Sequence, residues 1–338
     1  MTGDRLYGMD ALRGIAALLV VMVHTNDETL TLSLFNRGYL AVDLFLILSG
    51  YVIARSYEGK MANGLTLPDF LRCRVGRLWP TVFIGAVIGF QPFLGDMPTS
   101  LALTYLAMVL LFVPRFSSDA TTFPANPPTW SLFFELLVNV THHLALRFMG
   151  IRSLALLAAI CGAVLITFAE NGNVGSTGKD FLLGIPRLLG AYCTGILIWR
   201  LRQDRPLIPG WIGIVLLPAG ILLASVLPRS AGWPDFLFMY AACPIIVLSG
   251  LAPLRFLKTP LVFLGELSFP LYTVHYPILL ITLRHGVEWP IAVGLTILTA
   301  WLVQAVLKAK LFRAASPLTP LPATTAPVDA QSRLPAAQ

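Results

Sequence analysis

Charged residues are scarce in this sequence. Asp, Glu, Lys and Arg make up 12% of its 338 residues, whereas a soluble globular domain carries about 25%. Apolar residues account for 56%, and the mean hydropathy is +0.76. This composition excludes an ordinary soluble protein and predicts an all-α, polytopic transmembrane helix bundle. At about 20 residues per crossing, the chain has room for roughly ten helices, and no polar stretch is long enough for a separate soluble domain.

Cysteine is also scarce. The four cysteines are Cys73, Cys161, Cys193 and Cys243. No pair has the spacing of a metal site, and three lie in or beside apolar segments, where cysteine is typically a small apolar side chain. We therefore expect no metal. The net charge of +7 does not indicate nucleic acid binding, because the basic residues lie in short loops, as is typical of membrane proteins.

Eleven apolar segments follow one another along the chain, separated by Pro-rich or charged loops. They lie near residues 11–25, 38–54, 79–94, 99–114, 130–148, 153–169, 182–200, 210–227, 235–251, 261–283 and 289–312. The first has no small-residue cleavage site after it, so we expect a retained helix rather than a signal peptide. We expect residues 1–313 to form the membrane domain. The Ala-, Pro- and Thr-rich residues 314–338 predict a disordered cytoplasmic tail.

The basic loops predict the topology. They lie at 55–78, 147–152, 200–205 and 255–258 and at the start of the tail. The positive-inside rule places all of them in the cytoplasm, but three apolar segments separate the first two loops. We therefore expect one of segments 79–94 and 99–114 to be re-entrant or half-spanning, leaving ten crossings with both termini inside. Re-entrant backbone needs a cover of protein or water, so this region is expected to line a site.

Arg13 and His24 lie inside the first apolar segment. An arginine there costs about 2.5–3.5 kcal/mol on insertion scales, so an ionisable residue in a membrane helix indicates function. A separation of eleven residues is about three helical turns, so both side chains share a face and lie about 16 Å apart along the axis. The two side chains could line one buried tunnel, one of them near its mouth and the other near the bilayer centre.

Three further ionisable residues, Asp43, Glu135 and His275, lie in apolar surroundings. Together with Arg13 and His24 they must pair with one another or face water. Imidazole can act as a general base, and a carboxylate can fix its tautomer, so the set suits an acid–base catalyst. It suits a proton-coupled transporter equally well.

Arg72, Arg74 and Arg77 precede the apolar segment that begins near Trp79. Arg74 and Arg77 are three residues apart and share one face of a helical turn. Because guanidinium groups bind phosphate bidentately, the pair is suited to clamp a cytoplasmic ligand with several phosphates, such as coenzyme A. The same three arginines are also typical of a plain positive-inside anchor.

Five motifs, in order from Asp10 to about Phe312, resemble those of the acyltransferase-3 family of membrane acyltransferases. They are Arg13 with His24, Val42-Asp43-Leu44-Phe45 with Ser49-Gly50-Tyr51, Arg74-Val75-Gly76-Arg77 before Pro80, Trp130-Ser131-Leu132 with Glu135, and Ser268-Phe269-Pro270-Leu271-Tyr272-Thr273-Val274-His275. Two departures stand out: Phe269 replaces the family's usual Tyr, and Pro270 lies within the helix, where it can introduce a kink. Some members carry a fused extracytoplasmic hydrolase-like domain, whereas we expect this chain to act as a stand-alone bundle.

The resemblance implies an O-acyltransferase of the bacterial inner membrane. It would move a short acyl group, in the first place acetyl, from cytoplasmic acyl-CoA to a hydroxyl of a glycan, a glycolipid or another small molecule. His24 is then expected as the general base, oriented by Asp43 or Glu135. Arg13 is expected to bind the donor's phosphate or to polarise the thioester carbonyl.

The remaining roles implied by the resemblance concern binding. Arg74 and Arg77 are expected to clamp the coenzyme A phosphates. His275 is expected to line the acceptor path or to relay a proton. Trp130 is expected either to pack at the membrane interface or to stack on the acceptor.

Two other classes stay open on the sequence. One is a proton-coupled transporter or exporter of a small polar or glycan substrate, although no internal repeat is visible. The other is a non-catalytic subunit of a polysaccharide assembly, in which the buried charges pair helices. The sequence leaves open the acceptor, the acyl chain length, direct transfer versus an acyl-histidine relay, the side of the membrane of final transfer and the oligomeric state.

Overall fold

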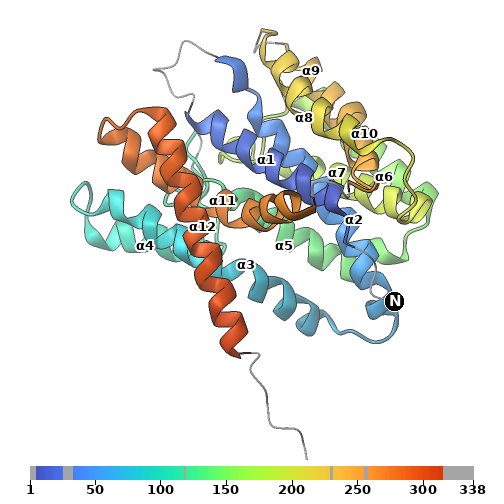
Figure 1. Ribbon diagram of the computed structural model, residues 1–338, viewed down its shortest axis with the longest axis horizontal. Coiled ribbons are helices and arrows are strands. Elements are labelled where there is room, and N and C mark those ends of the chain that lie inside the picture. The colour runs from blue at the N-terminus through green and yellow to red at the C-terminus, as the bar shows by residue number, and fades with distance from the viewer. Residues whose placement is uncertain (1–4, 26–32, 118, 229–230, 255–257, 315–338) are drawn as a thin grey trace, which may run out of the picture.

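The computed structural model describes residues 5–25, 33–117, 119–228, 231–254 and 258–314 (Figure 1). These residues form a helical bundle, with only isolated bridges between Leu94 and Met97 and between Thr121 and Thr177 outside the helices and turns. The expected all-α architecture is confirmed for this part of the chain. The tail expected at 314–338 lies outside the described residues from position 315 onward, and so does Arg255.

The helices follow the apolar segments of the sequence. Their bounds are α1 Tyr7–Thr25, α2 Ala41–Ala62, α3 Leu67–Phe90, α4 Thr99–Leu110, α5 Thr129–Leu144, α6 Ile151–Phe168, α7 Gly184–Arg202, α8 Gly210–Ser225, α9 Trp233–Leu237, α10 Cys243–Ser249, α11 Lys258–Arg284 and α12 Trp289–Ala314. A π-helical turn, Phe238–Ala242, joins α9 to α10. Short 3₁₀ turns extend several of the other helices, as Gly38–Leu40 does before α2.

Among the described residues, six helical stretches are long and apolar enough to cross a membrane. They are Tyr7–Thr25, Gly38–Ala62, Leu67–Phe93, Ile151–Phe168, Phe181–Arg202 and Trp289–Ala309. Helix α4 has 12 residues and is about 18 Å long at 1.5 Å per residue, shorter than a bilayer core of about 30 Å. The half-spanning segment expected at 79–94 or 99–114 and the total of ten crossings stay predictions.

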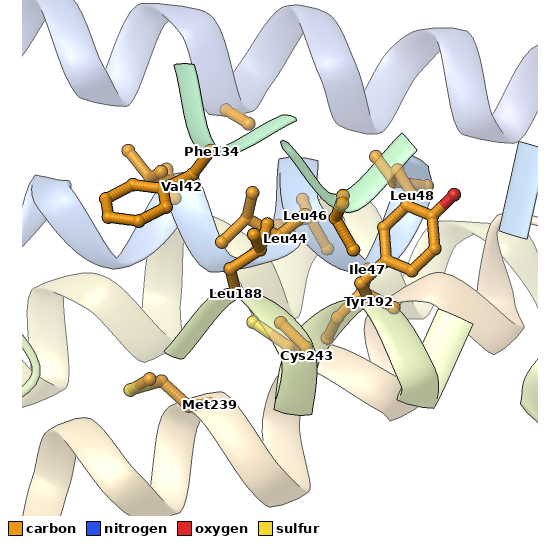
Figure 2. Packing of buried hydrophobic residues seen from close by; sticks show 14 of the residues in the cluster. Val42, Leu44, Leu46, Ile47, Leu48, Phe134, Leu188, Tyr192, Met239 and Cys243 are labelled. Carbon is orange, nitrogen blue, oxygen red and sulfur yellow. The ribbon is translucent and has the colours of Figure 1, made fainter. Parts of the chain in front are cut away.

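Close helix contacts at glycine hold the centre of the bundle together. A Cβ atom at Gly50 of α2 would collide with the Tyr192 carbonyl of α7, and one at Gly195 of α7 would collide with the Ile47 carbonyl of α2. Small residues let helix backbones approach in this way. Figure 2 shows the buried cluster beside this contact, in which Leu44 of α2 lies near Leu188 of α7 and Ile47 of α2 lies near Tyr192 of α7.

Three of the expected cytoplasmic loops meet at one end of the bundle. Arg200, at the end of α7, donates to Glu58 at 2.6 Å and to the Arg147 carbonyl at 3.1 Å. Arg55 binds both carboxylate oxygens of Asp204 at 2.8 to 3.0 Å. The basic loops that follow α2, α5 and α7 therefore share one face, as their charge predicted.

Candidate functional site

Two cavities lie along helix α1. The first has a volume of about 480 Å³ and is lined by eight charged side chains: Arg5, Asp10, Arg13, Arg74, Arg77, Glu135, Glu266 and Lys308. We call it the basic cavity. It meets α1 near the N-terminal end of that helix and extends along α2 as far as Ile53, close to the basic loop that follows α2.

The second cavity has a volume of about 470 Å³ and meets α1 at its other end, where His24 lines it. Tyr39, Trp130, Asn171 and Asn173 are among its other lining residues. Within the described part of the chain, no Lys, Arg, Asp or Glu lines it. We call it the neutral cavity.

Val42 and Tyr272 line both cavities and therefore form the boundary between them. The Tyr272 hydroxyl lies 2.5 Å from the Ser131 hydroxyl and donates to the Pro128 carbonyl at 3.3 Å. Arg13 and His24 thus line two adjoining cavities from one helix, with Val42 of α2 and Tyr272 of α11 between them. A single continuous tunnel containing both side chains stays a prediction.

Arg13 and Arg77 face the basic cavity without an acidic partner. In the described part of the chain, neither guanidinium forms a hydrogen bond or an ion pair. Their positive charges also repel one another. Asp10 and Glu135 attract the charge of Arg13 at longer range, and Glu135 attracts that of Arg77, whose side chain is exposed. Two neighbouring guanidinium groups without an ion pair can hold an anion between them. The arrangement therefore has the electrostatics of an anion site.

Arg74 has a different environment from Arg77. Arg74 is buried and forms an ion pair with Glu135, whose carboxylate also accepts from the Ser49 hydroxyl at 3.3 Å. This charge is thus already neutralised within the protein. Of the two arginines expected to clamp phosphate together, Arg74 lines the basic cavity while paired with Glu135, whereas Arg77 lines it without an ion pair among the described residues.

A charged network lines another part of the basic cavity. Glu266 of α11 forms an ion pair with Lys308 of α12 and accepts from Arg5 at 3.2 Å. Arg5 also donates to Asp10 at 2.7 Å. This network ties the start of α1 to α11 and α12 beside the two arginines that lack acidic partners.

His24 and His275 are brought together from opposite ends of the sequence. Their ring centroids lie 5.0 Å apart, and the Tyr276 ring lies edge-on to His24 at 5.4 Å. His24 Nδ1 lies 2.8 Å from the Val20 carbonyl oxygen. Since a carbonyl only accepts, Nδ1 carries the hydrogen and Nε2 carries the lone pair that a general base needs. His275 Nδ1 similarly donates to the Tyr272 carbonyl at 2.8 Å.

Comparison with known proteins identifies the family. A family model described as an acyltransferase domain matches residues 6–307. The chain belongs to the acyltransferase-3 family. Membership makes it an acyltransferase enzyme, and the apolar helices described above make it a membrane protein.

Several relatives of this acyltransferase are known by sequence. The chain is 33% identical to protein 2 in the picA locus of Rhizobium radiobacter, over 41% of this chain and 81% of that protein. It is 26% identical to acyltransferase MdmB of Streptomyces mycarofaciens, over 81% of this chain and 79% of the relative.

A third relative is named for an acceptor. It is a Bacillus subtilis protein provisionally named peptidoglycan O-acetyltransferase YrhL, 26% identical over 81% of this chain and 49% of that protein. The chain thus spans only about half of that relative. No solved structure matches.

The partner of Asp43 differs from the one expected in such an acyltransferase. Asp43 is fully buried and accepts from Arg187 Nε at 2.9 Å and Nη2 at 2.8 Å. Arg187 also donates to the Val174 and Tyr39 carbonyls, and its guanidinium lies 5.3 Å from the Trp130 ring. In the described part of the chain, Asp43 forms an ion pair with Arg187 and Glu135 forms one with Arg74. The sequence analysis had expected one of the two carboxylates to orient His24. A buried carboxylate needs an opposite charge, and α7 supplies it to Asp43.

A second buried ion pair, Arg37–Asp235, lies beside the neutral cavity. Its carboxylate accepts from the Tyr39 hydroxyl at 2.7 Å and from the Gly172 backbone N–H at 2.8 Å. The sequence motifs did not single out Arg37, Asp235 or Arg187. The signal that marked Arg13, an arginine within an apolar segment, also applies to Arg187.

Proposed function

We propose that this acyltransferase transfers a short acyl group, in the first place acetyl, from acyl-CoA to a hydroxyl of a carbohydrate or glycolipid. The observation that carries the proposal is the pair Arg13 and Arg77, which lack acidic partners among the described residues and share one cavity. The anion that such guanidinium groups bind best is a phosphate. Coenzyme A carries several phosphates and is the usual acyl carrier of group transfer.

The location of the basic cavity supports a cytoplasmic donor. It lies near the loops whose positive charge indicates the cytoplasmic side. We place the protein in the bacterial inner membrane with both termini in the cytoplasm, so that acyl-CoA enters from the compartment in which it is made. Lys308 and Arg5, which also line the basic cavity, add positive potential at the donor's charged end.

His24 is proposed as the base of the transfer. Nε2 takes the proton of the acceptor hydroxyl, whose oxygen attacks the thioester carbonyl. The carbon–sulfur bond breaks, the acyl ester forms, and the coenzyme A thiolate leaves and is protonated. Arg13 and His24 lie about 16 Å apart along α1. The donor's phosphates therefore bind near Arg13 in the basic cavity, and its thioester reaches His24 in the neutral cavity. The arm between them would have to displace the Tyr272 ring.

The relatives support the acceptor class. One is named for O-acetylation of peptidoglycan, a carbohydrate polymer, and another for acyl transfer without a stated acceptor. A hydroxyl on a sugar is the acceptor chemistry that the first name describes. We extend that class to this chain.

The proposal is tested with the full-length protein in lipid nanodiscs supplied with acetyl-CoA labelled in the acetyl group. Labelled ester should form on an added glycan with release of coenzyme A, and His24→Ala should stop both at unchanged protein yield. Release that continues at the wild-type rate in His24→Ala would contradict the base assignment. If the wild type neither binds nor consumes acetyl-CoA, the donor assignment is wrong.

A further inference from the structure

Two polar side chains of the neutral cavity have hydrogen-bonding capacity that the described protein leaves unused. Asn36 is 7% exposed and donates from Nδ2 to the Ser225 carbonyl at 3.3 Å, while its Oδ1 is buried without a partner in this part of the chain. The buried Thr121 hydroxyl likewise has no described partner. Both residues line the cavity. A buried acceptor without a donor is unfavourable, so both side chains gain hydrogen bonds when they turn these oxygens toward a ligand that brings hydroxyl groups into the cavity.

The surrounding wall is held rigidly. The buried Arg37–Asp235 pair holds the Tyr39 hydroxyl and the Gly172 backbone N–H through one carboxylate oxygen. Gly172 lies between Asn171 and Asn173, and both asparagines line the cavity. Arg37 also donates from its backbone N–H to the Ser225 hydroxyl at 3.2 Å, which fixes the chain next to Asn36. A wall organised in advance in this way lowers the entropic cost of binding a polar ligand.

The charge of the lining restricts the ligand. None of the described lining residues of the neutral cavity is Lys, Arg, Asp or Glu, whereas eight charged side chains line the basic cavity. A charged ligand group taken out of water into the neutral cavity would meet no opposite charge among the described lining residues. Asparagine, threonine and serine side chains can donate and accept hydrogen bonds with hydroxyl groups. The aromatic side chains of Trp130, Tyr39 and Tyr276 also line the cavity and contribute apolar surface.

We propose that the neutral cavity is a binding site for an uncharged sugar residue, with Asn36 and Thr121 as direct hydrogen-bond partners of its hydroxyls. The cavity volume of about 470 Å³ falls within the range of small-molecule sites, roughly 300–1,000 Å³. His24 lines the same cavity, so one hydroxyl of the bound sugar lies within reach of the base. In taking this sugar as the acyl acceptor, the inference rests on the proposed function.

Binding is measured without any need for turnover. The full-length protein in nanodiscs is titrated with methyl glucoside and methyl galactoside, which are uncharged, with methyl glucuronide, which is anionic, and with glucosamine, which is cationic. Saturation-transfer NMR reports binding. We expect an uncharged glycoside to bind and both charged sugars to bind at least about tenfold more weakly. Asn36→Leu should weaken binding of the uncharged glycoside by about tenfold, the effect of losing one good hydrogen bond.

Two further variants separate a binding role from a folding role. Thr121→Val is nearly isosteric, removes only the hydroxyl, and should also weaken glycoside binding. Asn139→Leu is the matched control, because Asn139 is fully buried with both amide atoms lacking a described partner but lines neither cavity. It should leave glycoside binding unchanged. Acetyl-CoA binding, measured on each variant, reports whether the basic cavity is intact.

The outcomes distinguish this inference from the proposed function. Unchanged glycoside binding in both Asn36→Leu and Thr121→Val would overturn the assignment of these residues. Equal binding of charged and uncharged sugars, or no binding of either uncharged glycoside, would overturn the ligand class. Glycoside binding that depends on Asn36, in a protein that never transfers acetyl from acetyl-CoA, would uphold the site and reject the acyl transfer.

Discussion

The hydroxyl of Tyr272 lies 2.5 Å from the hydroxyl of Ser131 and holds an aromatic ring across the boundary between the two cavities. The centroid of the same ring lies 5.7 Å from that of Phe45 and 5.8 Å from that of His275. Phe45 lines the basic cavity, and His275 contacts His24. Tyr272 thus lies between the proposed donor site and the proposed base. The size of the Tyr272 side chain and its hydrogen bond to Ser131 should both affect how tightly donor consumption is coupled to acyl transfer.

Removing the Tyr272 ring should uncouple donor consumption from transfer. In Tyr272→Ala the passage that the donor's arm needs stays open, so the thioester can enter the neutral cavity and meet water there whether or not an acceptor is bound. We expect coenzyme A release without acceptor to rise several-fold relative to release with acceptor. Tyr272→Phe keeps the ring, loses only the hydrogen bond, and should stay closer to wild type. Equal ratios in Tyr272→Ala and wild type would show that the ring does not separate the sites.

Substituting Arg77 should mainly weaken acetyl-CoA binding, whereas substituting Arg74 should mainly reduce stability. Arg77→Ala removes a cation that has no acidic partner among the described residues, so we expect the KM for acetyl-CoA to rise about tenfold or more with little loss of stability. Steady-state kinetics over a range of acetyl-CoA concentrations measures this. An unchanged KM would return Arg77 to the role of a membrane anchor.

Arg74→Ala leaves the Glu135 carboxylate without its ion-pair partner. Breaking a buried pair from one side costs about 3–5 kcal/mol, so folded yield should fall. Combining Arg74→Met with Glu135→Gln, which removes both charges, should recover most of that yield. Size-exclusion profiles after heating compare the two variants. If Arg74→Ala is as stable as wild type and only raises the KM, the clamp predicted from Arg74 and Arg77 together is correct.

Asp43→Asn separates a structural role from a catalytic one. Because Asp43 holds the buried Arg187, we expect a loss of about 3–5 kcal/mol of stability. We also expect near-normal turnover per folded molecule. Thermal unfolding and active-site-normalised rates measure the two effects separately. A stable Asp43→Asn protein with no turnover would restore the role of Asp43 in orienting His24.

Much of the site could be predicted from the sequence because the signals are local. Arg13 and His24 share a helix, so their spacing alone places both on one face. Partners drawn from distant segments could not be predicted in this way. Asp43 and Arg187 are 144 residues apart, and apolar periodicity fixes which residues form helices but not which helices meet. The cavity boundary was missed for the same reason, since Val42 and Tyr272 come from different helices.

The most direct test of acyl transfer through His24 is NMR of surface and secreted glycans from a strain that lacks the gene. The strain is complemented with either the wild-type chain or His24→Ala, and immunoblots show equal amounts of both in membranes. We expect O-acetyl signals to disappear in the deletion strain and to return only with the wild type. Return of those signals with His24→Ala would contradict the account of the base. Glycans unchanged by the deletion would contradict the glycan acceptor.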